Sequence, residues 1–174
     1  MKKFGAWALF TVVLYVLQSS VRPLIAWHEI SADLLLAEVV SVSFLRGSQA
    51  GAMLGFFAGL VQDLATGTFF GVDIFSKMLI GYGCGAFTRH FIKEQFFLPV
   101  FSVVAASAAN YFIILLFMIL LGYRFDWVEQ LSGLLIPMMA YNAVFAFPVH
   151  YWTRRMCERF DTTKRSMRRI GYDE

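Results

Sequence analysis

The chain has 174 residues, of which 59% are hydrophobic and 17% aromatic, and its formal net charge is +3. This is more apolar surface than the core of a small soluble domain can bury, so the composition excludes a soluble protein and leaves no length for a separate catalytic module. The basic residues stand at the ends of apolar runs and near the C-terminus, which is typical of membrane orientation rather than of nucleic-acid binding.

Six apolar segments follow one another along the chain and predict an all-α, polytopic bundle of six transmembrane helices. They cover residues 4–21, 32–45, 48–65, 71–90, 97–123 and 131–152. The first follows Lys2 and Lys3, as in a signal peptide, but no small-x-small cleavage site comes after it, so we expect a retained helix. The second is short for a span and contains Glu38, which favours a tilted or partly re-entrant helix.

The distribution of lysine and arginine predicts the orientation of this bundle. With the N-terminus in the cytoplasm, 12 of the 15 basic residues fall on the cytoplasmic side, while Arg22 and Arg124 fall outside and Lys77 lies within a helix. An odd number of spans would move the seven basic residues of the C-terminal tail outside. We therefore expect residues 1–153 to form a multi-pass domain of the cytoplasmic (inner) membrane with both termini inside. Residues 154–174 should form a basic cytoplasmic tail that contacts anionic lipid headgroups or a cytoplasmic partner.

A stripe of small residues runs along the third segment. Gly51, Gly55 and Gly59 form two overlapping G-x-x-x-G steps, and Asp63 and Gly67 continue the four-residue spacing. Residues four apart lie on one face of a helix, and small residues there let a second helix backbone approach closely. Two interpretations are open: the stripe packs within the chain, or it forms a face for a second copy or another partner.

The fourth segment repeats the four-residue spacing with Asp73, Lys77, Gly81 and Gly85. An acidic residue four positions before a lysine is the favourable order for an ion pair on a helix. Ionisable side chains at membrane depth usually face the bundle interior and are paired, so Asp73, Asp63 and Glu38 are the candidate partners of Lys77. A purely structural ion pair and a role in binding a ligand or partner are both open.

The remaining polar residues carry no sign of catalysis. Asn110 and Asn142 lie within the fifth and sixth segments, where a hydrogen bond between helices is the usual role of an amide. The three histidines and two cysteines fit no metal-ligand or redox spacing. No G-x-S-x-G, H-E-x-x-H or Walker motif is present. We therefore expect no enzyme activity, no cofactor and no metal.

The central motifs occur in a characteristic order: Asp33-Leu34-Leu35-Leu36, Arg46-Gly47, Gly51, Gly55-Phe56, Gly59-Leu60, Asp63, Gly67, Gly71, Gly81-Tyr82 and Gly85. A closing Tyr141-Asn142 helix and a basic tail follow them. Together with the size of the chain, these motifs resemble MreD, the rod shape-determining membrane protein family of bacteria. Many members carry proline directly before the Asp-Leu pair, whereas this chain has Ala32, which leaves the start of the second helix open.

The resemblance implies a non-enzymatic scaffold of the rod-shape complex, or elongasome. Such a scaffold binds MreC and acts with MreB filaments, RodA and a class B penicillin-binding transpeptidase in side-wall peptidoglycan synthesis and cell shape. The family is also similar in architecture to the S components of energy-coupling factor transporters, so a small-molecule-binding transporter subunit is the alternative. The candidate helix-packing or partner-binding residues are Gly51, Gly55, Gly59, Asp63, Gly67, Gly71, Asp73, Lys77, Gly81, Gly85 and Asn142.

Overall fold

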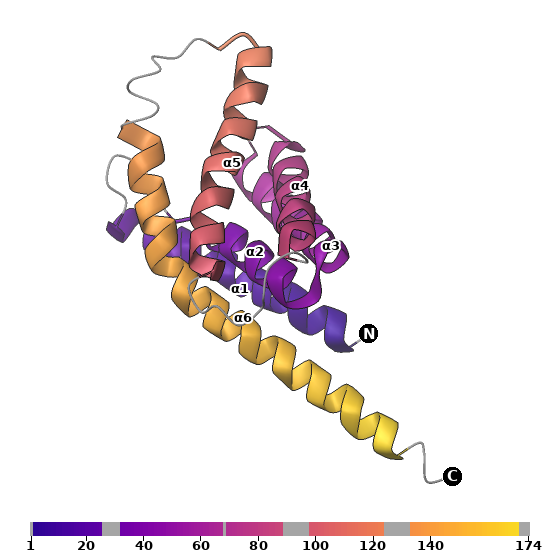
Figure 1. Ribbon diagram of the computed structural model, residues 1–174. Coiled ribbons are helices and arrows are strands. Elements are labelled where there is room, and N and C mark those ends of the chain that lie inside the picture. Colours follow the sequence, from indigo (N-terminus) through magenta and orange to yellow (C-terminus); the bar gives the residue numbers. More distant parts are fainter. Residues whose placement is uncertain (1, 26–31, 68, 89–97, 124–132, 171–174) are drawn as a thin grey trace.

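The computed structural model describes residues 2–25, 32–67, 69–88, 98–123 and 133–170. Over these residues the protein has six helices and no strand, so the all-α prediction is confirmed for the described part of the chain. The helices are α1 (Lys2–Ile25), α2 (Leu34–Arg46), α3 (Ser48–Thr66), α4 (Val72–Phe87), α5 (Leu98–Leu120) and α6 (Ile136–Ile170). Each helix falls on one of the predicted apolar segments, in the same order along the chain (Figure 1).

The shortest helix, α2, lies in the middle of the bundle and contacts all the others (Figure 1). Every residue from Leu34 to Ser43 is buried. Its 13 residues extend only about 20 Å, which is less than the roughly 30 Å of bilayer hydrocarbon. Because protein surrounds α2, it needs neither a polar face nor the length of a lipid-facing span. The weak, short second segment of the sequence is therefore the core of the fold.

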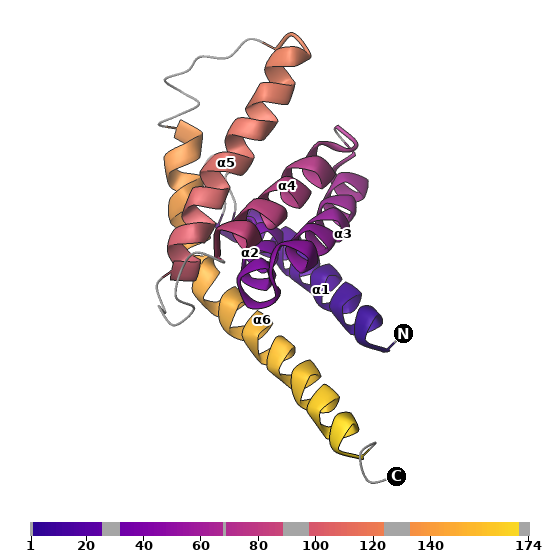
Figure 2. The ribbon, with the colours of Figure 1, turned by 45° about the vertical axis from the view of Figure 1, so that its right-hand side comes forward.

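Helices α3 and α4 lie side by side in both views of the ribbon (Figures 1 and 2). Glycines with positive φ stand at both ends of their connection, Gly67 at 66° after α3 and Gly71 at 102° before α4. A Cβ on either residue would meet no atom within 4 Å. These two glycines therefore adopt the positive-φ backbone conformation that reverses the chain. Neither belongs to the closely packed stripe of small residues that the four-residue spacing predicts.

Two helices of the described chain are long and apolar enough to cross a membrane, Val100–Leu120 and Gly133–Arg159. Both expose large apolar side chains, including Phe101, which is 73% exposed, and Val144, which is 70% exposed. Exposed apolar surface on this scale marks contact with lipid or with another protein. The two helices therefore fit a membrane location.

The last helix is longer than the sixth apolar segment. It continues from Ile136 through Pro148 to Ile170, and the sequence has no glycine between Gly133 and Gly171 to end it. The helix therefore continues without interruption across residue 153, where we predicted the boundary between the transmembrane domain and the tail. The N-terminal end of α1 and the C-terminal end of α6 lie on the same side of the bundle in both views (Figures 1 and 2).

Candidate functional site

The glycines of α3 and α4 bring the two helix backbones into direct contact. A Cβ on Gly55 would lie 2.6 Å from the carbonyl carbon of Lys77, and a Cβ on Gly51 would lie 2.6 Å from the carbonyl oxygen of Gly81. Gly59 lies against the backbone at Ile74 in the same way. No side chain larger than hydrogen fits at these distances, which explains why the sequence places glycine there. In this structure α4 covers the stripe, so these residues serve packing within the chain.

Gly85 extends the same contact to the start of α3. A Cβ on Gly85 would lie 2.7 Å from the carbonyl carbon of Gly47, the residue that precedes the helix. Ser43 of α2 closes this end, because its hydroxyl donates to the carbonyl oxygen of Gly81 at 2.8 Å. Ser43 was not identified from the sequence. A serine in an apolar segment gives no signal of which backbone carbonyl it will meet.

Asp63 connects the end of α3 to the beginning of α4. Its carboxylate accepts hydrogen bonds from the backbone N–H groups of Gly71 at 2.9 Å, Asp73 at 3.2 Å and Ile74 at 3.1 Å. The first N–H groups of a helix have no partner inside the helix, and a carboxylate there also complements the helix dipole. Asp63 is buried and acts as the cap of α4, so it is not placed as a partner of Lys77.

Replacing Asp63 with alanine is expected to lower the free energy of unfolding by about 1–3 kcal/mol, because three backbone N–H groups lose their acceptor. Asp63→Asn keeps one acceptor oxygen and should cost less. Thermal unfolding of the purified protein in detergent compares the two variants. If the alanine variant unfolds at the wild-type temperature, the carboxylate does not stabilise the start of α4.

Lys77 lies between two carboxylates. Its Nζ is 2.8 Å from Oδ1 of Asp73, one turn earlier on α4, and 3.0 Å from Oδ2 of Asp33, just before α2. The lysine side chain is fully buried, and those of Asp33 and Asp73 are only 8% and 16% exposed. A buried ammonium group is stable only when it is paired, and here two anions compensate one cation. The predicted pair with Asp73 is present, and Asp33 is a partner that the sequence spacing did not indicate.

Asp33 also begins α2. Its Oδ1 accepts the N–H of Leu36 at 2.9 Å, so one carboxylate oxygen caps the helix while the other pairs with Lys77. The capping role could be predicted from the sequence, because aspartate is a preferred residue at the N-cap of a helix, where it accepts the N–H of the residue three positions later. The ion pair with a residue 44 positions away is not, because it depends on how α2 and α4 pack.

Hydrogen bonds extend this cluster to three more helices. Asn142 of α6 accepts the N–H of Asp33 at 2.7 Å and donates to the hydroxyl of Ser107 on α5, also at 2.7 Å. Gln18 of α1 accepts the N–H of Leu34 at 2.9 Å. We refer to these connected residues as the Asp33 network, which comprises Gln18, Asp33, Asp73, Lys77, Ser107 and Asn142. It ties α1, α2, α4, α5 and α6 together, as expected of polar groups inside a membrane bundle.

Glu38 and Asn110 are buried polar residues that lie apart from this network. Glu38 of α2 is fully buried and accepts a hydrogen bond from the Thr11 hydroxyl at 3.1 Å, while its Oε2 has no partner among the described residues. It was a candidate partner of Lys77, but the ion pairs of that lysine are with Asp33 and Asp73. Asn110 is also buried, and its Oδ1 likewise meets no partner in the described part of the chain.

The arrangement as a whole is suited to holding helices together. Within the described ranges, no group of three or more histidine, cysteine or acidic residues is placed to bind a metal ion. Cys84 and Cys157 are free thiols, and His150 lies on α6, whereas His28 and His90 fall outside the described residues. The one positive charge of the Asp33 network, on Lys77, is paired with both of its carboxylates inside the protein.

Comparison with known proteins gives one family. Residues 1–160 match the family described as MreD, rod shape-determining protein MreD. No curated protein and no solved structure gives a significant match. The family match covers all six helices up to the distal part of α6 and agrees with the resemblance carried by the central glycine and aspartate motifs.

Proposed function

The chain belongs to the MreD family, and on this basis we propose that it is a non-enzymatic scaffold of the elongasome that binds MreC directly. Family membership places the protein in the membrane and gives it a role in rod-shape determination. Direct binding to MreC goes beyond family membership and is our proposal. Through MreC the scaffold would act in the same complex as MreB filaments, RodA and a class B penicillin-binding transpeptidase, and so couple the filaments to side-wall peptidoglycan synthesis.

One observation supports a scaffold above all others: the buried ionic groups of the site are used inside the chain. Lys77 is fully buried between Asp33 and Asp73, and the carboxylate of Asp63 accepts hydrogen bonds from backbone N–H groups. A catalytic or ligand-binding group needs access to a second molecule. Groups engaged in this way fix the positions of helices, which is what a rigid docking partner requires.

We further propose that six spans place both termini in the cytoplasm. The excess of lysine and arginine on that side supports this orientation, with 12 of the 15 basic residues. The ends of α1 and α6 on one side of the bundle agree with it (Figure 2). The short helices α2, α3 and α4 would then lie within the bilayer because longer helices and lipid surround them.

The alternative function, a small-molecule-binding subunit of an energy-coupling factor type transporter, needs a cavity with several convergent polar groups. A groove of about 470 Å³ runs between α4 and α5, but among the described residues that line it only Ser102 and Cys84 have polar side chains. Apolar residues such as Phe87, Phe101 and Ile113 provide most of the rest of its lining. A groove of this composition favours contact with apolar protein or lipid over recognition of a water-soluble metabolite.

Affinity purification from mildly solubilised membranes, followed by mass spectrometry of proteins and small molecules, tests the proposal. We expect the tagged protein to bring down MreC in stoichiometric amount, and an unrelated tagged polytopic membrane protein to bring down none. Recovery of a stoichiometric metabolite together with an ATPase-bearing partner, in place of MreC, would replace the scaffold with the transporter subunit.

A further inference from the structure

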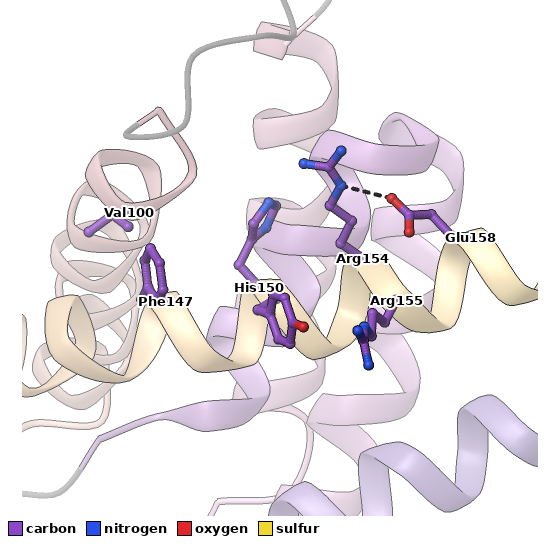
Figure 3. Close-up of a pocket in the computed structure, with 7 residues that line it drawn as sticks. Val100, Phe147, His150, Arg154, Arg155 and Glu158 are labelled. Carbon is purple, nitrogen blue, oxygen red and sulfur yellow. Dashed lines mark hydrogen bonds and ion pairs between the residues drawn. The ribbon is translucent and has the colours of Figure 1, made fainter.

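A second cavity lies away from the Asp33 network, where α6 leaves the bundle beside the start of α5 (Figure 3). Its volume is about 320 Å³. Val100 of α5 and Phe147 of α6 line one end, and His150, Arg154 and Glu158 follow along α6. Phe147, His150, Arg154 and Glu158 are spaced by three or four positions, so these four share one face of the helix. Tyr151 and Arg155 complete the lining beside them.

The lining changes from apolar to charged along the helix axis. Phe147 is 52% exposed at the apolar end, and Arg154 comes two turns later, near the end of the apolar helix Gly133–Arg159. An aromatic residue followed by arginine is typical of the level where lipid acyl chains meet headgroups. The cavity therefore has the polarity of an amphiphile and stands at the depth where a phospholipid headgroup lies.

The polar end of the cavity presents donors for a single negative charge. Figure 3 shows His150 and Arg154 projecting from the same side of α6, with Glu158 beside the arginine. Arg154 uses its Nε for Glu158 at 2.9 Å, and its guanidinium has further N–H groups that can bind a phosphate. The Nδ1 atom of His150 is buried, so Nε2 is the ring nitrogen that a ligand in the cavity can reach. Arg155 also lines the cavity, and its guanidinium carbon lies 5.3 Å from the centre of the Tyr151 ring.

We propose that this cavity is a binding site for an anionic phospholipid. The phosphodiester lies between His150 and Arg154, an acyl chain follows Phe147 and Val100, and Arg155 adds a second positive charge at the rim. With Glu158 included, the described residues of the lining carry a net charge of one positive unit, which complements one phosphodiester. The apolar half of the lining favours a lipid over free phosphate, because it can contact an acyl chain. The site does not depend on MreC binding. We assign it to the cytoplasmic leaflet, and only this assignment rests on the proposed orientation.

Native mass spectrometry of the full-length, delipidated protein with added phosphatidylglycerol or phosphatidylcholine tests this site. We expect phosphatidylglycerol to bind in preference. Arg154→Gln should lower its affinity about fivefold, since one basic residue near an anionic lipid contributes on that order. Arg159→Gln removes the same charge from the same helix outside the cavity lining and should change the affinity less than about twofold. Glu158→Gln should raise the affinity, a gain that misfolding cannot produce.

Three results would overturn the proposal. Equal losses in Arg154→Gln and Arg159→Gln would show that lipids respond only to the overall charge of the helix. Equal binding of phosphatidylcholine would reduce the cavity to an apolar groove. Displacement of phosphatidylglycerol by inorganic phosphate would identify a site for a soluble anion. None of these outcomes affects the MreC experiment, so the two proposals fail separately.

Discussion

Replacing Gly55 with leucine is expected to abolish accumulation of the folded protein. A Cβ alone at this position would lie 2.6 Å from the carbonyl carbon of Lys77, so the helices α3 and α4 would have to move apart. The contact is with backbone and not with a flexible side chain, so the clash cannot be relieved by a rotamer change. Overpacking costs roughly 1–3 kcal/mol even where side chains can adjust, and the cost here should exceed that range. The amount of detergent-soluble monomer and its thermal unfolding measure the effect.

Gly83 offers a matched control on α4. It is also a glycine inside a helix, but a Cβ there would meet no atom within 4 Å, because the residue faces the groove between α4 and α5. Gly83→Leu should therefore leave accumulation and unfolding close to wild type. If both leucine variants behave alike, close backbone contact between α3 and α4 is not what the fold depends on.

Lys77→Met is expected to destabilise the protein by about 3–5 kcal/mol, the typical cost of leaving a buried charge without its partner. The substitution keeps the length of the side chain but leaves the carboxylates of Asp33 and Asp73 facing each other without a cation. Asp33 also caps α2 and contacts α6 through Asn142, so the substitution should destabilise the packing of α2 at the centre of the bundle. Thermal unfolding in detergent and resistance to protease measure the loss.

A compensated variant separates the charge from the shape of the lysine. Adding Asp33→Asn and Asp73→Asn to Lys77→Met removes both stranded anions, and asparagine at position 33 keeps an oxygen that can cap α2. We expect this triple variant to recover most of the lost stability. A triple variant as unstable as Lys77→Met alone would mean that the ion pairs themselves, and not the stranded carboxylates, account for the loss.

The helices were predictable because each one carries an apolar run that is visible in the sequence. Even the backbone contact between α3 and α4 was partly predictable, since Gly51, Gly55 and Gly59 repeat every four residues and only close packing requires that. The same spacing misled at Gly67, which continues the repeat by number but lies past the end of α3. Spacing in the sequence does not show where a helix ends, whereas the left-handed backbone conformation of Gly67 in the structure does.

The centre of the site was not predictable in the same way. Asp33 and Lys77 meet because α2 is enclosed by the other helices, and the sequence shows α2 only as a short and doubtful span. Asn142 was a candidate for a hydrogen bond between helices, but its partners, Ser107 and the N–H of Asp33, depend on how α5 and α6 pack around α2. Periodicity describes one helix at a time, and these contacts are properties of several.

These contacts agree with the proposed structural role. The Asp33 network joins five of the helices through buried and partly buried groups, and α3 is held to α4 by Asp63 and by the glycine contacts. Exposed apolar surface remains on α5 and α6, where lipid or a partner helix can lie. Internally paired polar groups and an apolar outer surface are consistent with the proposed membrane scaffold.

The most direct test of the scaffold is binding between the two purified proteins in lipid nanodiscs with no other component present. We predict that the wild-type protein forms a stable one-to-one complex with MreC. Failure of the folded wild-type protein to bind MreC at any ratio would contradict the scaffold, and it would do so whatever the cellular complex contains.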